Sequence, residues 1–545
     1  MQKMKKMKNF KRSVILSAIL CMCMCLSLLA GATFALFTSE AKVNIAITSG
    51  KVDVQATISE MKLSHMEWNS TNGTYEEVEG SLFAGSNANL DEENQVLTIS
   101  QMVPMDKISL NINIKNNSNI NAMYRLVVSS LENDGLFSGL VIKINGNEYL
   151  GAKLITEYEQ LEVNSTDKNI LVTIELPQDA GNEYQDKSCK ISYAVEAIQA
   201  NASNGIYEVT PENAQTVLDT IEGDATVVLT EGDYEKLYLR QSLEASTRRT
   251  DLDVSESSYP AYYREFKNVT IKAKENANVT CDGIMVEAGL FWHASAPASN
   301  QDVIHANSGF ISYILLENIV IEGITFDNTS TTAVLLRDNA SNQAKGSTLY
   351  VDGFMITNCK ATGDTSNSNI HFFSAGSGSN DLAFCGSDAS KVGINNVIIA
   401  NNEANSYYQP ICMNNAVAIL NNLMVKNNTF TDCVDNIVQL SNKTNRGEFI
   451  FDGNTFTNMQ GRFIRMANAS SNAVVRFKNN TTITPKKYDA DGLDIAKITS
   501  LSGDDGFKVY CYQDDWTINT NTTSKWIAYG NEAILPTDAY STSGN

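Results

Sequence analysis

The 545-residue sequence is poor in the residues from which metal sites and disulfide frameworks are built. It contains four histidines, and no CxxC pair occurs after residue 35. The cysteines beyond that point are an odd number spread over a long chain, namely Cys189, Cys281, Cys359, Cys385, Cys412, Cys433 and Cys511. This pattern argues against a structural zinc site and a disulfide scaffold, so no metal ligands and no cofactor are assigned.

Positive charge is also scarce, with 41 Lys and Arg against 62 Asp and Glu and a formal net charge of -21. Nucleic acid is therefore excluded as a partner, because its binding depends on clustered basic residues. The acidic balance leaves Ca²⁺ open as a ligand, although no Asp-rich loop of the EF-hand type occurs.

Long apolar runs are absent except for one, Val14 to Ala30, which follows a cluster of basic residues. This arrangement predicts a signal peptide over residues 1–35, with Leu36 as the first mature residue. An uncleaved membrane anchor is the alternative, but the run is at the short limit for crossing a bilayer. Removal of the six leader charges takes the formal charge from -21 to -27. The sequence thus predicts a secreted protein, extracellular or on a bacterial cell surface, with no membrane contact after cleavage.

Residues 36–202 alternate between apolar and polar positions, as in Ile108 to Ile114, Leu171 to Leu176 and Ile191 to Ala197. Alternation with a period of two predicts half-buried strands, and no convincing amphipathic helix interrupts them. We therefore expect a β-sandwich or jelly roll in this region.

The start of this region resembles the TasA/camelysin family of biofilm-fibre and surface proteins. The resemblance rests on Gly31 to Ser39, Ile47 to Val54 and Pro104 to Leu110, and it extends to about residue 200. It implies export, a jelly-roll-like sandwich and self-association in which an N-terminal strand completes the sheet of a neighbouring copy. A sandwich that only displays the second half of the chain is the alternative.

Residues 203–525 repeat short apolar strands separated by Asn, Asp and Gly corners, for example at Leu316 to Phe326, Ile419 to Phe430 and Phe449 to Phe456. Irregular repeats of this size predict stacked coils, and Asn suits tight corners because it tolerates the left-handed conformation. Cys359 and Cys433 close similar units and are expected to point inward and stack. The region resembles pectate-lyase-like right-handed parallel β-helices, followed by a tail over 526–545. A second antiparallel sandwich is the alternative.

Catalytic motifs are weak in this region. Hydrolysis of a glycan needs paired carboxylates, and lyase chemistry needs a base and a cation beside an acidic sugar. The neighbouring pairs Asp504-Asp505 and Asp514-Asp515 point apart on a strand. Arg337, Arg462 and Arg465 are the candidates for a lyase site, with a structural ion pair or surface charge as the alternative role.

Aromatic residues between the strands are candidates for stacking on sugars, namely Trp292 beside His293, and Tyr407 beside Tyr408. Packing within the β-helix would explain them equally well. The sequence therefore favours a non-catalytic surface or biofilm-matrix protein whose β-helix adheres to a polysaccharide or another surface protein. The alternative is an extracellular polysaccharide lyase or glycoside hydrolase that acts on an acidic glycan, as in the enzymes that the β-helix resembles.

Overall fold

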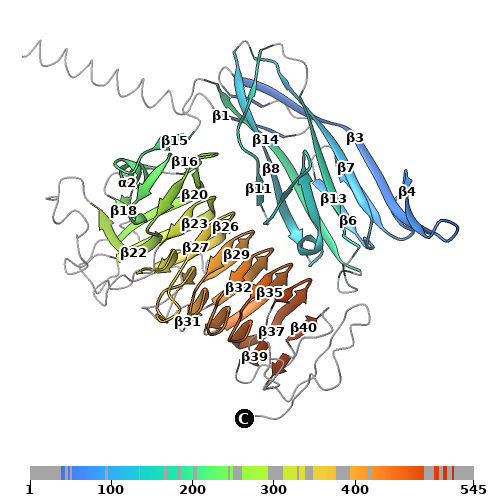
Figure 1. Ribbon diagram of the computed structural model, residues 1–545. Helices are drawn as coiled ribbons and strands as arrows, with labels where there is room; N and C mark the ends of the chain where they lie inside the picture. Colours follow the sequence, from blue (N-terminus) through green and yellow to red (C-terminus); the bar gives the residue numbers. More distant parts are fainter. Residues whose placement is uncertain are drawn as a thin grey trace, which may run out of the picture. The chain divides into compact units, whose positions relative to one another are not determined.

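The computed structural model shown in Figure 1 divides into two compact units. Unit 1 comprises residues 1–180 and 184–204, and unit 2 comprises residues 181–183 and 205–545. The structure describes residues 38–42, 47–49, 52–91, 96–118, 120–133, 135–151, 153–163, 168–178, 180, 184, 186–200, 205–221, 223–242, 246–248, 261–292, 311–327, 330–337, 348–375, 393–414, 419–442, 444–483, 496–501, 507–511 and 518–520. Within this part of the chain, no helix is long and apolar enough to cross a membrane.

Unit 1 contains two antiparallel seven-stranded sheets around one hydrophobic core. The strands of the first sheet are β1 (Thr38–Lys42), β5 (Asn87–Asp91), β6 (Val96–Ser100), β8 (Ala122–Asn133), β11 (Lys153–Ile155), β12 (Glu159–Leu161) and β14 (Ser188–Gln199). The strands of the second are β2 (Ile47–Ser49), β3 (Val52–Asn69), β4 (Thr74–Glu79), β7 (Lys107–Asn116), β9 (Val141–Ile144), β10 (Asn147–Tyr149) and β13 (Lys168–Glu175). A single 3-10 turn, η1 (Phe137–Gly139), is described between β8 and β9.

Period-two alternation determines which side chains enter this core. In β7 every second residue is fully buried, because successive side chains of a strand point to opposite faces. The first strand, β1, pairs antiparallel with β14 of the same chain, from Thr38 opposite Ile198 to Lys42 opposite Ala194. Pairing of this strand with a neighbouring copy stays a prediction.

Unit 2 is a parallel β-helix, which confirms the predicted all-β fold. Its strands stack in register in a 19-stranded sheet, which bends between two faces, and in a separate 8-stranded sheet. Figure 1 shows the long strands from β20 to β37 side by side in chain order, coloured from green to orange. Consecutive coils are joined by parallel pairing, for example Val425 of one coil beside Phe451 of the next.

Face 1 consists of nine short strand segments, which are β18 (Leu237–Ser242), β22 (Ile284–Trp292), β25 (Val334–Arg337), β28 (Phe373–Ala375), β31 (Ile411–Asn414), β34 (Val438–Ser441), the first residues of β37 (Ile464–Lys478), β39 (Ala496–Ser500) and β41 (Ile518–Thr520). Face 2 consists of β15 (Ile206–Val209), β16 (Ala225–Leu229), β20 (Ala261–Ala273), β23 (Ile311–Glu322), β26 (Thr348–Thr357), β29 (Ile394–Ala400), β32 (Ile419–Lys426), β35 (Thr444–Asp452), the rest of β37 and β40 (Lys508–Cys511). Face 3 is the 8-stranded sheet of β17 (Gly232–Tyr234), β21 (Val279–Cys281), β24 (Thr325–Asp327), β27 (Lys360–Thr362), β30 (Glu403–Asn405), β33 (Thr429–Thr431), β36 (Thr455–Thr457) and β38 (Thr481–Ile483). The short β19 (Thr247–Arg248) pairs antiparallel with β20.

Asparagine forms the corners of the β-helix. The corner between faces 2 and 3 contains a stack of buried asparagines, Asn402, Asn428, Asn454 and Asn480, spaced 26 residues apart. The Nδ2 of Asn428 donates to the Oδ1 of Asn454 at 3.0 Å, and the Nδ2 of Asn454 donates to the Oδ1 of Asn480 at 2.8 Å. This ladder satisfies polar groups that would otherwise be buried without partners at each turn.

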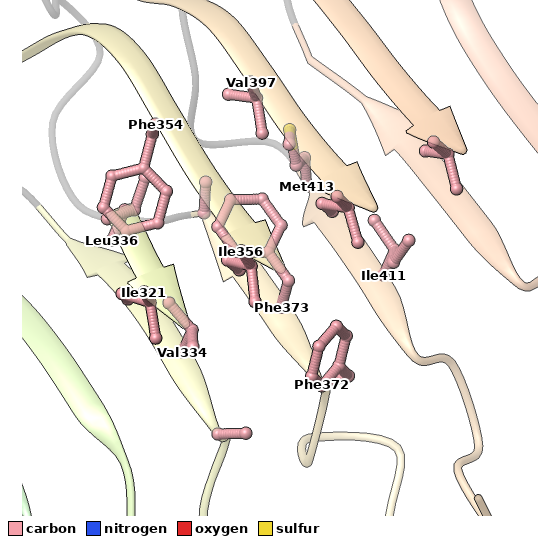
Figure 2. Close-up of a cluster of buried hydrophobic side chains, with 14 of the residues drawn as sticks. Ile321, Val334, Leu336, Phe354, Ile356, Phe372, Phe373, Val397, Ile411 and Met413 are labelled. Atoms are coloured by element: carbon pink, nitrogen blue, oxygen red, sulfur yellow. The ribbon is translucent and has the colours of Figure 1, made fainter. Parts of the chain in front are cut away.

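The inside of the β-helix is filled by stacked apolar side chains from all three faces. Figure 2 shows part of this core, in which Val334 and Leu336 of face 1 lie near Ile321 of face 2. At the first coil, α2 (Ala214–Thr220) contributes buried Leu218 and Asp219. Asp219 accepts two hydrogen bonds from Arg240, at 3.0 and 2.9 Å, so the buried charge at this end of the helix is paired.

Cys359 and Cys433 both point into the core, as predicted, and both are free thiols. Their expected stacking on one another is wrong. The backbone N–H of Cys359 bonds to the Asn402 side chain, so this cysteine precedes the asparagine ladder. Cys433 instead follows the next corner, in register with Tyr407, because Asn405 pairs with Thr431.

Candidate functional site

Three of the long segments between coils begin at one edge of face 1. The segments 293–310, 338–347 and 376–392 follow β22, β25 and β28, which are neighbours in the sheet. The ends of neighbouring parallel strands meet at one edge, so these three segments begin on the same flank of the β-helix. Loops gathered on one side of a solenoid commonly mark its binding surface.

The outward side chains of face 1 change character along the stack. The register places Leu335, Ser374, Cys412, Gln439, Arg465 and Lys497 at one position on successive coils. Their neighbours in the strands, such as Val438 and Leu440, point into the core. Along these six positions the row begins apolar, continues with uncharged polar groups and reaches two cations, after which the register continues to Asn519.

Three basic residues gather at the later coils of face 1, and we call Arg462, Arg465 and Lys497 the cationic patch. Arg465 and Lys497 occupy the same register position on neighbouring coils, which in a parallel sheet lie about 4.8 Å apart. Arg465 is exposed, and Lys497 is partly exposed. Arg462 lies just before β37, where its carbonyl accepts a hydrogen bond from the Ile437 N–H at 2.9 Å.

The edge of the cationic patch has unused hydrogen-bonding capacity. The side-chain oxygen Oδ1 of Asn436 and the Nε of Arg462 are both buried, and neither has a hydrogen-bond partner among the described residues. The backbone register places these two residues on neighbouring coils. One atom accepts and the other donates, which are the two roles that a hydroxyl group fulfils at once.

A hydrogen-bonded network lies beside the patch on the preceding coils. The Nδ1 of His371 is 2.7 Å from the Gln409 carbonyl, and the Nε2 of Gln409 donates to the Asp435 carboxylate at 2.6 Å. The Nδ2 of Asn436 donates to the Oε1 of Gln439 at 3.1 Å.

Burial determines the charge states in this network. It lowers the pKa of His371 below its ordinary value of 6.5, so the imidazole is neutral at pH 7. Burial raises the pKa of the Cys412 thiol to about 12, and the charge of Asp435 adds to that rise. Cys412 is therefore a protonated thiol and is unsuited to act as a nucleophile.

The structure brings two of the three candidate arginines together. Arg462 and Arg465 belong to the cationic patch, whereas Arg337 ends β25, several coils earlier, in register with Glu287. Tyr407 was expected to be available to a sugar, and this is wrong, because its side chain is 1% exposed. Its ring occupies the space beside Gly363, where an added Cβ would lie 2.4 Å from it. Tyr408 is partly exposed.

Several other predictions fall outside the described part of the chain. They concern the leader 1–35, the tail 526–545, the side chain of Trp292, His293 and the pairs Asp504-Asp505 and Asp514-Asp515. Within the described residues, no group of three or more His, Cys, Asp or Glu side chains could hold a metal ion.

Four residues of this site were not predicted from the sequence, namely Gln439, Asn436, Asp435 and Lys497. The 26-residue spacing of the asparagine ladder was available as a signal, because it places Gln439 one coil before Arg465. The register of Lys497 could not be found in this way, because the insertion after β38 changes the spacing.

Comparison with known proteins gives no family. No family model matches the chain, and no curated protein matches it. Among solved structures, the Agl-KA catalytic domain is 8% identical with a TM-score of 0.18, covering 84% of this chain and 93% of that one. The catalytic domain of a GH87 α-1,3-glucanase in complex with tetrasaccharides is 10% identical with a TM-score of 0.21, covering 89% and 98%. A GH31 α-xylosidase from Xanthomonas citri is 8% identical with a TM-score of 0.09, covering 47% and 35%. Similarities this low carry no argument about function.

Proposed function

We propose that this chain is an exported glycan-binding protein of the cell surface or extracellular matrix, and that the cationic patch holds an anionic polysaccharide. The observation that carries the proposal is the register of Arg465 and Lys497, which places two cations side by side on a strongly acidic protein. A local positive field on such a protein selects anionic groups, and guanidinium forms paired hydrogen bonds with carboxylate or sulfate.

The neighbouring polar groups suit the rest of a sugar chain. The amides of Asn436 and Gln439 lie on the coil before Arg465, and amides both donate to and accept from hydroxyl groups. A solenoid face is an extended surface on which a polymer can contact several coils. Binding without cleavage is the simpler role, because the nearby thiol of Cys412 is protonated and unsuited to act as a nucleophile.

A second candidate function is cleavage of the same glycan by a lyase or a glycoside hydrolase. The neutral imidazole of His371 and the carboxylate of Asp435, both linked to Gln409, favour it because both are general-base groups. Calcium that neutralises a uronate would be compatible with either function.

The test uses the purified chain without residues 1–35, incubated with polygalacturonate, alginate, hyaluronan and neutral dextran, with and without Ca²⁺. Binding is measured by calorimetry, and turnover by ultraviolet absorbance of unsaturated products and by new reducing ends. We expect binding to an anionic polymer that Arg465→Gln weakens roughly tenfold or more, the range for a charged hydrogen bond. Lys360→Gln is the matched control, because Lys360 is an exposed cation of face 3 that pairs with Glu403.

Equal binding to dextran, or equal weakening by Lys360→Gln, would contradict the proposal. Turnover that disappears in Asp435→Asn would replace binding by the second candidate.

A further inference from the structure

A two-stranded ribbon extends from the second sheet of unit 1. The pairing of β3 with β7 ends at Ser64 opposite Lys107, but β3 continues to Asn69 and pairs there with β4. We call residues 65–79 the acidic ribbon. A ribbon of two strands buries little surface of its own, so its side chains are open to a partner.

The end of the acidic ribbon carries two exposed aromatic side chains. Trp68 is 57% exposed and Tyr75 is 44% exposed, and the two residues are direct cross-strand partners. Their ring centroids are 5.2 Å apart, with an angle of 69° between the planes. The rings therefore form a corner and not a flat platform. A sugar ring stacks on one flat face, whereas a cation is attracted by the faces of both rings.

Apart from the buried His65, the charged side chains of the ribbon are acidic. The ribbon contains Glu67, Glu76, Glu77 and Glu79, and no Lys or Arg. Glu67 and Glu76 face one another directly, and the His65 ring lies 3.1 Å from the Glu67 carboxylate. Asn69 and Asn72 both donate to the Oε1 of Glu76, and these bonds lower its pKa and keep it ionised.

The aromatic corner and two of the carboxylates lie on the same side of the ribbon. Tyr75, Glu77 and Glu79 alternate along β4, so their side chains project from one face about 7 Å apart. The ammonium group of Lys107 already lies 3.6 Å from Glu77, which shows that a lysine side chain fits beside this carboxylate. The spacing matches every second residue of an extended peptide.

We infer that the acidic ribbon is a docking surface for an extended Lys- or Arg-rich segment of another protein. One basic side chain lies in the corner between Trp68 and Tyr75, and the next basic residues pair with Glu77 and Glu79. A second copy of this chain is a poor occupant, because its formal charge of -21 has the same sign as the ribbon. The inference does not depend on the proposed function, which concerns unit 2.

The test is calorimetric titration of the chain with a twelve-residue peptide of alternating Lys and Ser, in low and moderate salt. The chain as a whole attracts polycations, so the aromatic variants decide the result. We expect Trp68→Ala to weaken binding about tenfold, within the range of a partly desolvated cation–π contact, and Trp68→Phe to retain most of it. Leu131→Ala is the matched control, because Leu131 is 56% exposed elsewhere in unit 1.

Three results would overturn the inference: no binding of the Lys peptide, equal binding by Trp68→Ala and the intact chain, or equal weakening by Leu131→Ala. Sedimentation of the chain alone supplies a further check. Self-association that Trp68→Ala abolishes would identify a second copy as the occupant and would also contradict the inference. Melting curves of each variant show whether the sandwich remains folded, and Trp68→Phe keeps the test decisive if Trp68→Ala does not.

Discussion

The β-sandwich and the β-helix are both built from strands, but they differ in where the backbone takes a positive φ. Among the described residues of unit 2, the non-glycine residues with positive φ are asparagines, at corners and at bends within the long strands, and Asp224, Ser406 and Asp432 are the exceptions. In unit 1 such residues are fewer and mixed, for example Gln101 and Met105. A solenoid repeats the same bend in each coil, so the residue that best tolerates the left-handed conformation recurs.

The two units also differ in how far apart in sequence their contacts reach. In unit 1 the first strand pairs with the last, as Thr38 does with Ile198, so the core closes only when the whole unit folds. In unit 2 each coil pairs with its neighbours, as Phe430 does with Phe456. Stability should therefore be shared across the sandwich but local along the β-helix.

The largest expected effect comes from removing a stacked ring from the core of the β-helix. Phe451 is fully buried, and its ring centroid is 5.2 Å from those of Phe463 and Phe477. We expect Phe451→Ala to destabilise the neighbouring coils by about 3–5 kcal/mol, the usual cost of such a cavity. Hydrogen exchange should increase mainly from β32 to β37. The matched change Ile112→Ala in β7 should increase hydrogen exchange throughout the sandwich. If Phe451→Ala increased exchange equally along the whole β-helix, stability would not be local in that unit.

A second test concerns the asparagine ladder. The Oδ1 of Asn454 accepts from the Asn428 side chain at 3.0 Å, and its Nδ2 donates to the Val425 carbonyl at 2.8 Å. Asn454→Ala leaves these buried groups unpaired, and we expect a loss of about 3 kcal/mol by denaturant unfolding. Asn458→Ala is the comparison, because Asn458, unlike Asn454, has a positive φ and is bonded through one exposed contact to Asp432. Its cost should be about 1–2 kcal/mol, the strain of the left-handed conformation alone. A cost of Asn454→Ala no larger than that of Asn458→Ala would contradict the stabilising role of the ladder.

Much of both folds could be predicted from local patterns, because alternation and asparagine corners are properties of neighbouring residues. The register between coils could not be predicted, because the earlier coils contain insertions of different lengths. The later coils are evenly spaced, as Thr429, Thr455 and Thr481 show. Tyr407 shows the consequence. It lies between strands of the sequence pattern and was a candidate for stacking on a sugar, with packing as the alternative. It follows the corner at Ser406, where the equivalent Cys433 is also buried, so the packing alternative holds. The cationic patch likewise exists only through register, because Arg465 and Lys497 are distant in sequence.

The third prediction concerns the pH dependence of stability, which should have opposite directions in the two units. His65 of the sandwich is 6% exposed, and its ring nitrogens lie 2.9 Å from the Ser81 carbonyl and 3.1 Å from the Glu67 carboxylate. Both partners accept, so these bonds raise the pKa of His65 above 6.5. The charged form is favoured in the folded state, so its contribution is complete below pH 6.5 and is lost as the pH rises through the folded pKa.

His371 of the β-helix behaves in the reverse way, because burial lowers its pKa below 6.5. In the unfolded chain His371 binds a proton more readily than in the folded chain. Its contribution to folding stability is therefore present above pH 6.5 and is lost as the pH falls through the folded pKa. Hydrogen exchange of each unit at several pH values measures these changes separately. We expect His65→Gln to flatten the profile of the sandwich alone and His371→Gln that of the β-helix alone. If the histidine variant of a unit left the pH profile of that unit unchanged, other groups would cause its pH dependence.

The smallest expected effect compares one buried tyrosine in each unit. Tyr193 in the sandwich core is 1% exposed, and its hydroxyl has no hydrogen-bond partner among the described residues. Tyr234 in the β-helix donates to the Val209 carbonyl at 2.8 Å and lies 3.0 Å from the Thr230 carbonyl. Removing an unpaired hydroxyl relieves a desolvation cost, whereas removing a paired one loses a buried hydrogen bond, although the Val209 carbonyl keeps its bonds from Thr230. We therefore expect Tyr193→Phe to leave the sandwich unchanged or stabilise it by up to about 1 kcal/mol, and Tyr234→Phe to destabilise the β-helix by about 1–2 kcal/mol. Denaturant unfolding of both variants checks the signs. A loss in Tyr193→Phe equal to that in Tyr234→Phe would mean that the Tyr193 hydroxyl is hydrogen-bonded in solution, and that the two cores satisfy their polar groups equally well.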